Sequence, residues 1–368
     1  MSTQLVILRE TEDGEHRVAL APAVVKKLTD LGFDIHLEAG AGEAAGIPDE
    51  AFDVSTSADR SALLGKANVV FAVQPPSPET VKAMQKGAVL VSFMHPHKHP
   101  ELVSAMKDGG ITGLALERVP RISRAQSMDA LSSQAACAGY RAALIAATSL
   151  HRFLPMLTTA AGTIRPAKVL VIGAGVAGLQ AIATARRLGA MVEGFDVRSA
   201  TREQVESLGA KFVDTGIKAE GEGGYARELT DEEKEQQNEV LADHIAAADA
   251  VITTAAIPGK PAPKIISAAM VERMKPGAVI IDMAAETGGN CEVTKAGEEV
   301  AHGDARVIGP VNLPSDLAEH ASEMYARNLL NFVMPWFGED GMSIDWDDEV
   351  YAKSVLTRDG EIVAEDLK

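Results

Sequence analysis

The sequence predicts an α/β fold of two doubly wound, Rossmann-like domains with parallel sheets and a cleft between them. Two observations support this prediction. Short apolar runs alternate with segments of helical periodicity, which is typical of parallel strands joined by crossover helices. The alternation occurs in two successive blocks, and the length of 368 residues fits about two domains of ordinary size.

The first block contains five strand-like runs, which are LVILRE, FDIHLEAG, NVVFAVQ, AVLVSFM and TGLALE. Helical segments such as APAVVKKLTDLG and HPELVSAMKDGG lie between them, and the block ends near Leu116. From about Ser132 to Leu157 the apolar spacing predicts one long helix that joins the two domains. The segment TTAAGTIRPA that follows is expected to be a loop.

The second block begins with KVLVIGAGVAGLQAIATARRLGAMVEGFDV and continues through DAVITTAA, AVIIDMAA and RVIGPV. A helical segment, LAEHASEMYARNLLNFVMPWF, follows it and is expected to return to the first domain. The acidic residues 345–368 then suggest a short hairpin and a tail. We therefore expect one domain of residues 1–131 with 325–368, and a Rossmann domain of residues 132–324.

Composition argues against several classes of protein. No run of about 18 apolar residues occurs, and the N-terminal residues lack the pattern of a secretory signal, so we expect a cytoplasmic protein. The net charge of −17 opposes binding to nucleic acid or to anionic membranes. Cys137 and Cys291 lack a CxxC spacing and a nearby histidine, which favours reduced, buried thiols and argues against a metal site.

The strongest local motif is a glycine-rich turn between the apolar run KVLVI and a helical segment. Its predicted cofactor-binding residues are Gly173, Ala174, Gly175, Val176 and Gly178. Glycine permits the tight turn and the close approach of a pyrophosphate to the N-terminus of the helix, where free N–H groups and the helix dipole favour anions. The motif predicts a dinucleotide site.

Asp196 ends the next strand, where its carboxylate can accept hydrogen bonds from both ribose hydroxyls of an adenosine and repel a 2′-phosphate. This position predicts NAD(H) as the cofactor. Arg198 could instead pair with a 2′-phosphate, but Asp196 at the strand tip is expected to dominate. We assign Val197, Arg198 and Ala255 to the same cofactor site.

Candidates for substrate chemistry are less distinctive. A dehydrogenase of alcohols or amines needs a general acid or base near the nicotinamide and usually a cation for a substrate carboxylate. Arg17 and the histidines His95, His97 and His99, which follow a predicted strand, are the candidates. A cluster of this composition is more often a solvated loop than a base or a metal site.

Residues 120–134 contain two arginines, two glutamines, one aspartate and four serines between apolar segments. An exposed interdomain linker is one interpretation of this segment, although a linker needs no such density of hydrogen-bonding groups.

The chain resembles the NAD(H)-binding component, domain I, of proton-translocating NAD(P)+ transhydrogenases whose alpha subunit is split into two chains. The resemblance runs almost from end to end. It is carried by RETEDGEHRVALAP, PRISRAQSMDALSS, AGYRA, VIGAGVAGLQAI, FDVR, GGYARE, TTAAIPGKPAPKIIS and MAAETGGNCE.

The resemblance implies direct hydride transfer between NADH on this chain and NADP+ on a partner subunit, coupled to proton movement across the membrane. It implies that Arg121 and Ser132 orient the carboxamide of the nicotinamide, that Asp129 supports them, and that Gln126 reaches toward the partner's nucleotide. Gly224 and Tyr225, in a glycine- and charge-rich segment, correspond to a lid over the bound cofactor.

The implied partners are an NADP(H)-binding component, a proton-conducting membrane subunit and a second copy of this chain in a homodimer. The chain would then lie at the cytoplasmic face of the inner membrane, held there by its partner subunits. No nucleic acid and no membrane span of its own are expected.

Alanine dehydrogenase resembles the same two-domain architecture and supplies the alternative, a stand-alone NAD-dependent amino-acid dehydrogenase. Its arginine and histidine positions match Arg17 and His95, but its catalytic lysine falls on Gln74. That departure removes a substrate-binding cation and argues against amino-acid oxidation. A non-catalytic NAD-sensing module is a third hypothesis.

Overall fold

The structure is a computed structural model that describes residues 3–217, 227, 229–256, 260–338 and 341–368. Internal contacts divide the chain into a first unit, Met1–Gln134 with Pro314–Lys368, and a second unit, Ala135–Leu313. The domain boundaries proposed from the sequence differ by assigning 132–134 and 314–324 to the second domain. Helix α10, Ala318–Val333, which the boundary at 325 would cut, lies wholly within the first unit.

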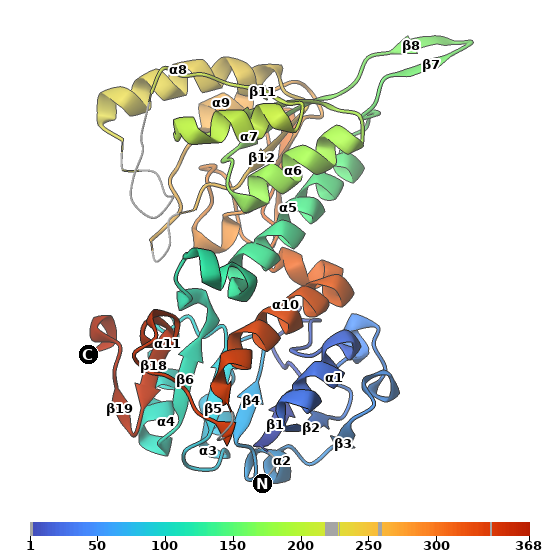
Figure 1. The fold of residues 1–368 in the computed structure, drawn as a ribbon. Helices are drawn as coiled ribbons and strands as arrows, with labels where there is room; N and C mark the ends of the chain where they lie inside the picture. The colour runs from blue at the N-terminus through green and yellow to red at the C-terminus, as the bar shows by residue number, and fades with distance from the viewer. Residues whose placement is uncertain (1–2, 218–226, 228, 257–259, 339–340) are drawn as a thin grey trace. The chain divides into compact units, whose positions relative to one another are not determined.

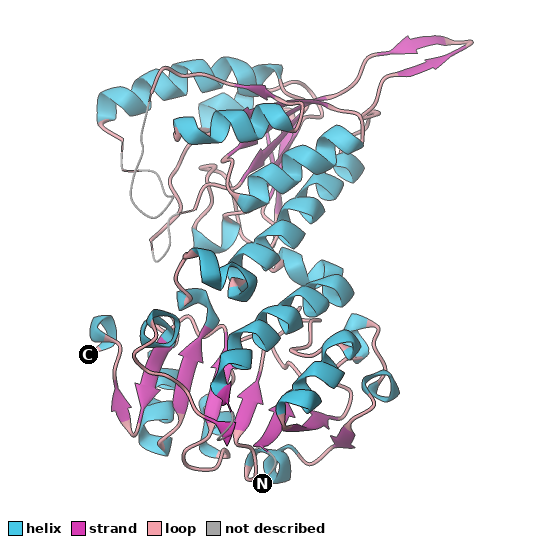
Figure 2. Ribbon diagram, viewed as in Figure 1, coloured by secondary structure: helices cyan, strands magenta, loops and turns pink. Residues whose placement is uncertain are grey.

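The first unit contains an eight-stranded sheet in the order β19-β18-β6-β5-β4-β1-β2-β3 (Figures 1 and 2). Strands β1 to β6 are parallel, and β18 and β19 extend the β6 edge in antiparallel pairing. The strand bounds are β1 Thr3–Ile7, β2 Phe33–Glu38, β3 Ser55–Ser57, β4 Val69–Phe71, β5 Val89–Ser92, β6 Thr112–Ala115, β18 Val355–Arg358 and β19 Glu361–Ile362, beside a separate pair of β16 Phe337–Gly338 and β17 Gly341–Met342.

Helices cover both faces of this sheet because its strands are apolar on both sides, as expected for parallel strands. Along β1, Leu5 and Ile7 join the core under α1, α10 and α11, whereas Val6 joins the core under α2, α3 and α4. The helix bounds are α1 Pro22–Leu31, α2 Arg60–Leu64, α3 Pro78–Lys82, α4 Pro100–Gly109 and α11 Glu349–Ser354, in addition to α10.

The second unit contains a seven-stranded sheet in the order β11-β10-β9-β12-β13-β15-β14, in which only β14 is antiparallel among the described strands. Helices α5 to α7 cover one face, and α8 and α9 cover the other. The bounds are β9 Lys168–Ile172, α6 Val176–Arg187, β10 Met191–Phe195, α7 Arg202–Ser207, β11 Lys211–Phe212, α8 Asp231–Ala247, β12 Ala250–Thr253, α9 Ala268–Glu272, β13 Val279–Asp282, β14 Glu299–His302 and β15 Ala305–Ile308.

Helix α5, Ala130–Ser149, begins in the first unit and ends in the second, so the long helix is present but the predicted end at Leu157 is wrong. The expected loop after it contains a β-hairpin of β7, Leu157–Thr159, and β8, Gly162–Ile164, which extends away from the rest of its unit (Figure 1). Phe153 and Met156, which continued the apolar spacing, are exposed and do not pack as a helical face.

The predicted α/β class with two Rossmann-type, mainly parallel sheets is confirmed. The antiparallel edge strand β14 and the short elements β3, α2, α3 and α11 were not predicted. The expected C-terminal hairpin is present, and it adds β18 and β19 to the sheet of the first unit. Among the described residues, no helix has both the length and the apolar character needed to cross a bilayer.

Candidate functional site

The order of the second sheet changes direction between β9 and β12, and the crevice beyond the carboxyl ends of such strands is where open α/β sheets bind ligands. The glycine-rich turn follows β9, and Thr254 and Ala255 follow β12. The backbone N–H of Thr254 donates to Ile172 at 2.8 Å, and its hydroxyl donates to the carbonyl of Gly173 at 3.0 Å. The structure therefore brings Ala255 next to the glycine-rich turn.

The three glycines of the turn differ in how a larger residue would be accommodated at each position. Gly173 has a φ of +96°, which side chains rarely adopt. A Cβ at Gly178 would collide with the carbonyl of Gly173, whereas a Cβ at Gly175 would meet no atom within 4 Å. No side chain caps the N-terminus of α6, where Val176 is exposed, so the first-turn N–H groups can receive an anion.

Asp196 closes the turn from the end of β10. Its carboxylate accepts from the backbone N–H of Ala174 at 2.7 Å, which ties the two strand ends together. It also forms an ion pair with Arg198, whose Nε and Nη2 donate at 2.8 and 2.7 Å. Val197, between them, is partly buried against the core beneath α8 and α9.

Asn290 and Asp282, which were not predicted from the sequence, form a buried support for this site. The side chain of Asn290 accepts from the N–H of Ala255 at 3.1 Å and donates to the carbonyls of Ala255 and Pro263 at 2.8 and 2.9 Å. Asp282, at the end of β13, accepts from the hydroxyl of Thr253 and from the N–H of Cys291. The motif MAAETGGNCE contains the asparagine, but only the fold reveals what it contacts.

The predicted lid residues Gly224 and Tyr225 lie outside the described residues, as do residues 257–259 of the IPGKPAPK motif. The other predicted cofactor-binding residues all follow β9, β10 or β12 in the second unit.

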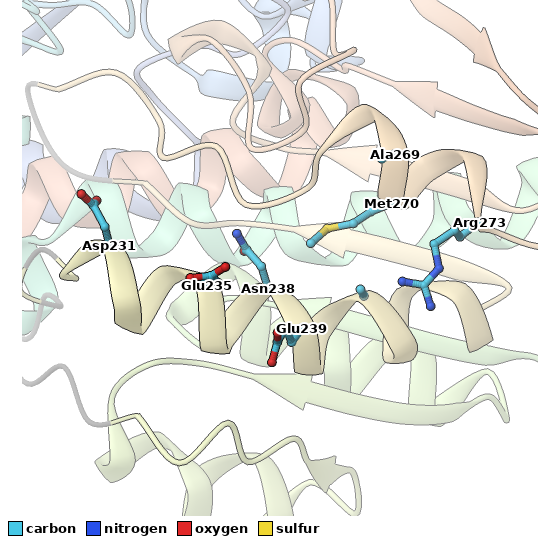
Figure 3. Close-up of a pocket in the computed structure, with 8 residues that line it drawn as sticks. Asp231, Glu235, Asn238, Glu239, Ala269, Met270 and Arg273 are labelled. Carbon is cyan, nitrogen blue, oxygen red and sulfur yellow. The ribbon is translucent and has the colours of Figure 1, made fainter.

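An open hollow of about 580 Å³ lies between α8 and α9 and contains none of the predicted site residues. Its lining residues are drawn in Figure 3. Three of its side chains are acidic, and its arginine is paired with Asp243 at 2.9 Å. Such a surface opposes a phosphate-bearing ligand. Its lining consists of Asp231, Glu235, Asn238, Glu239, Ala242, Ala269, Met270 and Arg273.

In the first unit, residues 120–134, here called the polar stretch, are anchored to α10 and α11. Several of their polar side chains are exposed, namely Arg121, Ser123, Arg124, Gln126 and Ser127. The polar stretch contains a 3₁₀ helix, Ser123–Met128, whose Ala125 and Met128 are buried. Arg124 pairs with Asp348 through two bonds of 2.7 Å, and Asn328 of α10 donates to the carbonyl of Ser127 at 2.9 Å.

The four residues expected to take part in hydride transfer, Arg121, Gln126, Asp129 and Ser132, lie on this segment. Arg121 and Gln126 are exposed. Asp129 precedes α5 and accepts from the backbone N–H of Ser132 at 2.9 Å and from its hydroxyl at 2.6 Å. This arrangement caps the helix and holds Asp129 and Ser132 together, as the expected supporting role of Asp129 requires.

The sheet of the first unit also changes direction, between β1 and β4, but side chains of the protein itself occupy the strand ends there. Glu10 accepts from the backbone N–H groups of Val73 and Gln74 at 2.6 and 3.2 Å. Arg17 is buried and donates to both carboxylate oxygens of Glu15, at 2.8 and 2.6 Å, and to Gln134 at 2.8 Å.

The pKa values of the two carboxyl groups in this cluster, Glu10 and Glu15, are shifted in opposite directions. Burial, with repulsion from Glu15, raises the pKa of Glu10 from 4.5 to about 7. Burial opposes ionisation of Glu15 too, but its bonds with Arg17 lower the pKa of Glu15 below its ordinary value. Gln74 donates to Glu15 at 2.8 Å, so the position of the dehydrogenase lysine holds an amide bonded to an internal carboxylate.

The three candidate histidines have different surroundings. His95 has a φ of +43° and stacks on Phe93 with a ring-centroid distance of 6.0 Å. His97 contacts Asp366 at 3.2 Å, and His99 contacts Glu101 at 3.3 Å. Among the residues that the structure describes, no group of three or more His, Cys, Asp or Glu could hold a metal ion.

Two family models match the chain. The model described as alanine dehydrogenase/PNT, N-terminal domain, matches residues 6–138, and the one described as alanine dehydrogenase/PNT, C-terminal domain, matches residues 142–365.

Individual proteins give a more specific similarity. The chain is 47% identical to the first part of the NAD(P) transhydrogenase subunit alpha of Rhodospirillum rubrum, over 98% of this chain and 97% of that protein. The crystal structure of transhydrogenase from Sinorhizobium meliloti matches it with a TM-score of 0.87 at 42% identity, over 99% of each chain. Alanine dehydrogenase of Bacillus subtilis is 33% identical over 77% of this chain and 71% of that protein.

Proposed function

The chain belongs to the alanine dehydrogenase/PNT family, and from that membership we propose that it is the NAD(H)-binding component of a proton-translocating NAD(P)+ transhydrogenase. Its reaction is direct hydride transfer between NADH held on this chain and NADP+ held on a partner subunit. The more distant similarity to alanine dehydrogenases leaves amino-acid oxidation as the competing function.

The observation that favours transhydrogenation is the bonding of Arg17. An amino-acid dehydrogenase needs a cation to hold the substrate carboxylate and a group that moves a proton. Here the Arg17 guanidinium is bonded to the internal carboxylate of Glu15, and Gln74 stands where the dehydrogenase has lysine. Transfer between two nicotinamide rings requires neither group, because no proton moves with the hydride.

The roles of the polar stretch follow from that chemistry. Ring-to-ring transfer depends on position and on the exclusion of water. In this proposal Arg121 and Ser132 orient the nicotinamide carboxamide, Asp129 holds Ser132, and Gln126 faces the partner's nucleotide. The mutual bonds of Asp129 and Ser132 and the anchoring of residues 123–128 supply the rigidity that such positioning needs.

In the second unit, the glycine-rich turn and the N-terminus of α6 receive the pyrophosphate, and Asp196 receives the adenosine ribose. NAD(H) supplies the hydride when it is bound. The uncapped helix N-terminus and the open space at Gly175 support this assignment.

The partners in this proposal are an NADP(H)-binding component and a membrane subunit that conducts protons, which would hold this chain at the cytoplasmic face of the inner membrane. A second copy of the chain completes a homodimer. Exposed apolar side chains of the β7–β8 hairpin and of the segment just before it, among them Phe153, Met156 and Ile164, offer a surface that a second copy would cover.

The test combines the purified chain with a separately prepared NADP(H)-binding component. We expect reduction of an NADP+ analogue that depends on NADH and on both proteins. NADH-dependent amination of pyruvate by the chain alone would instead establish an alanine-type dehydrogenase. Binding of NADH without either reaction would favour a sensing module.

A further inference from the structure

The carboxylate of Asp196 is fully bonded within the protein. A carboxylate offers about four lone-pair directions, and four N–H groups occupy those of Asp196. Oδ1 accepts from the backbone N–H and the Nε of Arg198 at 2.9 and 2.8 Å, and Oδ2 accepts from the N–H of Ala174 and the Nη2 of Arg198 at 2.7 Å each.

These four donors differ in how they can be removed. The two backbone N–H groups, of Ala174 and Arg198, belong to the strand ends and to the glycine-rich turn that the fold fixes. The two guanidinium donors belong to a flexible side chain that is about a quarter exposed, at 23%, whereas the Asp196 side chain beneath it is 6% exposed. Rotation of Arg198 would therefore free one lone-pair direction on each oxygen.

Two freed acceptors match the two hydroxyls of a ribose. The guanidinium fork and a vicinal diol each present two adjacent donors to a carboxylate. We infer that Arg198 is an internal competitor for the ribose-binding carboxylate, and that a ligand bearing a 2′,3′-diol must displace its side chain before Asp196 can receive the ribose. Arg198 thereby weakens binding of NAD(H) and sets the cofactor preference of the site.

The Asp196–Arg198 ion pair should affect the binding of NADH and of NADPH in opposite directions. With Arg198 in place or nearby, the negative charge of Asp196 is compensated, and a displaced guanidinium lies within reach of a 2′-phosphate. Without Arg198, the bare carboxylate accepts a diol more readily and repels a 2′-phosphate more strongly. Removal of the guanidinium should tighten NADH binding and weaken NADPH binding.

This inference rests on the proposed NAD(H) site of the second unit, and calorimetry on the whole chain tests both. Arg198→Met keeps a long side chain but loses the fork, and Arg187→Met, in the last turn of α6, is a control for the loss of one positive charge. We expect the Kd for NADH to fall about three- to tenfold in Arg198→Met and the Kd for NADPH to rise, because a partly buried, charge-assisted competitor is lost. Arg187→Met should match the wild-type protein.

Two further comparisons make the test specific. ADP should gain affinity in Arg198→Met, whereas 2′-deoxy-ADP, which has lost one hydroxyl, should gain less. Arg198→Lys, which lacks the fork, should fall between the wild type and Arg198→Met. An unchanged or raised Kd for NADH in Arg198→Met, with wild-type protein that binds NADH, would overturn the competition alone. No binding of NADH to any of these proteins would overturn the proposed function as well.

Discussion

Glu10 is a partly buried carboxyl whose ionisation should control the stability of the first unit. Its pKa is raised from 4.5 to about 7. The folded protein therefore keeps the proton up to about pH 7, whereas the unfolded chain releases it near pH 4.5. The stabilisation of the folded state by the protonated Glu10 carboxyl is fully present below pH 4.5 and is lost as the pH rises through 7.

We predict that Glu10→Gln, which resembles the protonated carboxyl, removes this pH dependence. Between pH 5 and 8 the free energy of unfolding should fall more in the wild type than in the variant, by on the order of 3 kcal/mol at about 1.4 kcal/mol for each pKa unit. Urea unfolding at the two pH values measures it, and the exposed Glu50→Gln is the control. Parallel pH profiles for wild type and Glu10→Gln would contradict the assignment.

Asn290 should act as a positioning residue for the cofactor site. Asn290→Ala would leave the buried backbone groups of Ala255 and Pro263 without partners, at a cost on the order of 2 kcal/mol. We predict a lower free energy of unfolding and a higher KM for NADH, with a smaller change in kcat. Asn238→Ala, in the open hollow of α8, should change neither, and equal KM values for Asn290→Ala and wild type would exclude the positioning role.

At this scale, residue type and spacing predicted part of the group of residues that gathers at the strand ends of the second unit. The glycine-rich turn and Asp196 follow local rules that a sequence displays. The pairing of Asp196 with Arg198 is not readable in the same way, because an arginine near a strand end can face a ligand or its own neighbour. Asn290 was missed since its partner, Ala255, lies 35 residues away along the chain.

Helix α6 and the turn before it contain one glycine required by the fold, Gly178, and one expected to contact the ligand, Gly175, and their substitutions should have different effects. Gly178→Ala would place a Cβ against the carbonyl of Gly173, and we predict a loss of about 1–3 kcal/mol in stability together with loss of NADH binding. Gly175→Ala meets no neighbour within 4 Å. It should unfold like the wild type but bind NADH weakly, because its methyl group takes the space of the pyrophosphate.

Urea unfolding and calorimetry on this matched pair give the comparison. If Gly175→Ala binds NADH as tightly as the wild type, the pyrophosphate does not lie at this turn.

Among the elements, long periodic segments were predictable and their ends were not. Helix α5 was expected to continue to Leu157 because Phe153, Met156 and Leu157 extend the apolar spacing. Instead these side chains are exposed, and Arg152, beyond the end of the helix, pairs with the buried Asp249 at 2.5 Å. Pro155 lies within the predicted span and cannot continue a helix, so the sequence itself argues against an end at Leu157. It does not show the end at Ser149, because Asp249, the partner of Arg152, lies 97 residues away along the chain.

The proposed homodimer is a property of the whole molecule, and the β7–β8 hairpin supplies its test. Met156 and Ile164 are exposed at 64% and 44%. We predict a dimer for the wild type in sedimentation velocity, and dissociation for Met156→Lys with Ile164→Lys, because a second copy would have to bury two charges. Met334→Lys in the first unit, also at an exposed apolar residue, is the control. A monomeric wild type, or a dimer unaffected by the paired lysines, would contradict a hairpin interface.

The central claim about the molecule is that it positions a nicotinamide for hydride transfer and performs no acid–base chemistry. Its two units support this in different ways. The second offers a nucleotide turn where its sheet order reverses, whereas the first has filled the corresponding strand ends with Glu10, Glu15 and Arg17.

The most direct measurement is the steady-state rate of hydride transfer from NADH to NADP+ on a saturating partner component, for Arg121→Ala, Gln126→Ala and His95→Ala. Displacement from a near-attack geometry can cost about a hundredfold, so the first two variants should be slow while NADH binding suffers less. His95→Ala should transfer hydride nearly as fast as the wild type. An inactive His95→Ala beside active Arg121→Ala and Gln126→Ala would contradict the transhydrogenase function and favour an alanine-type dehydrogenase.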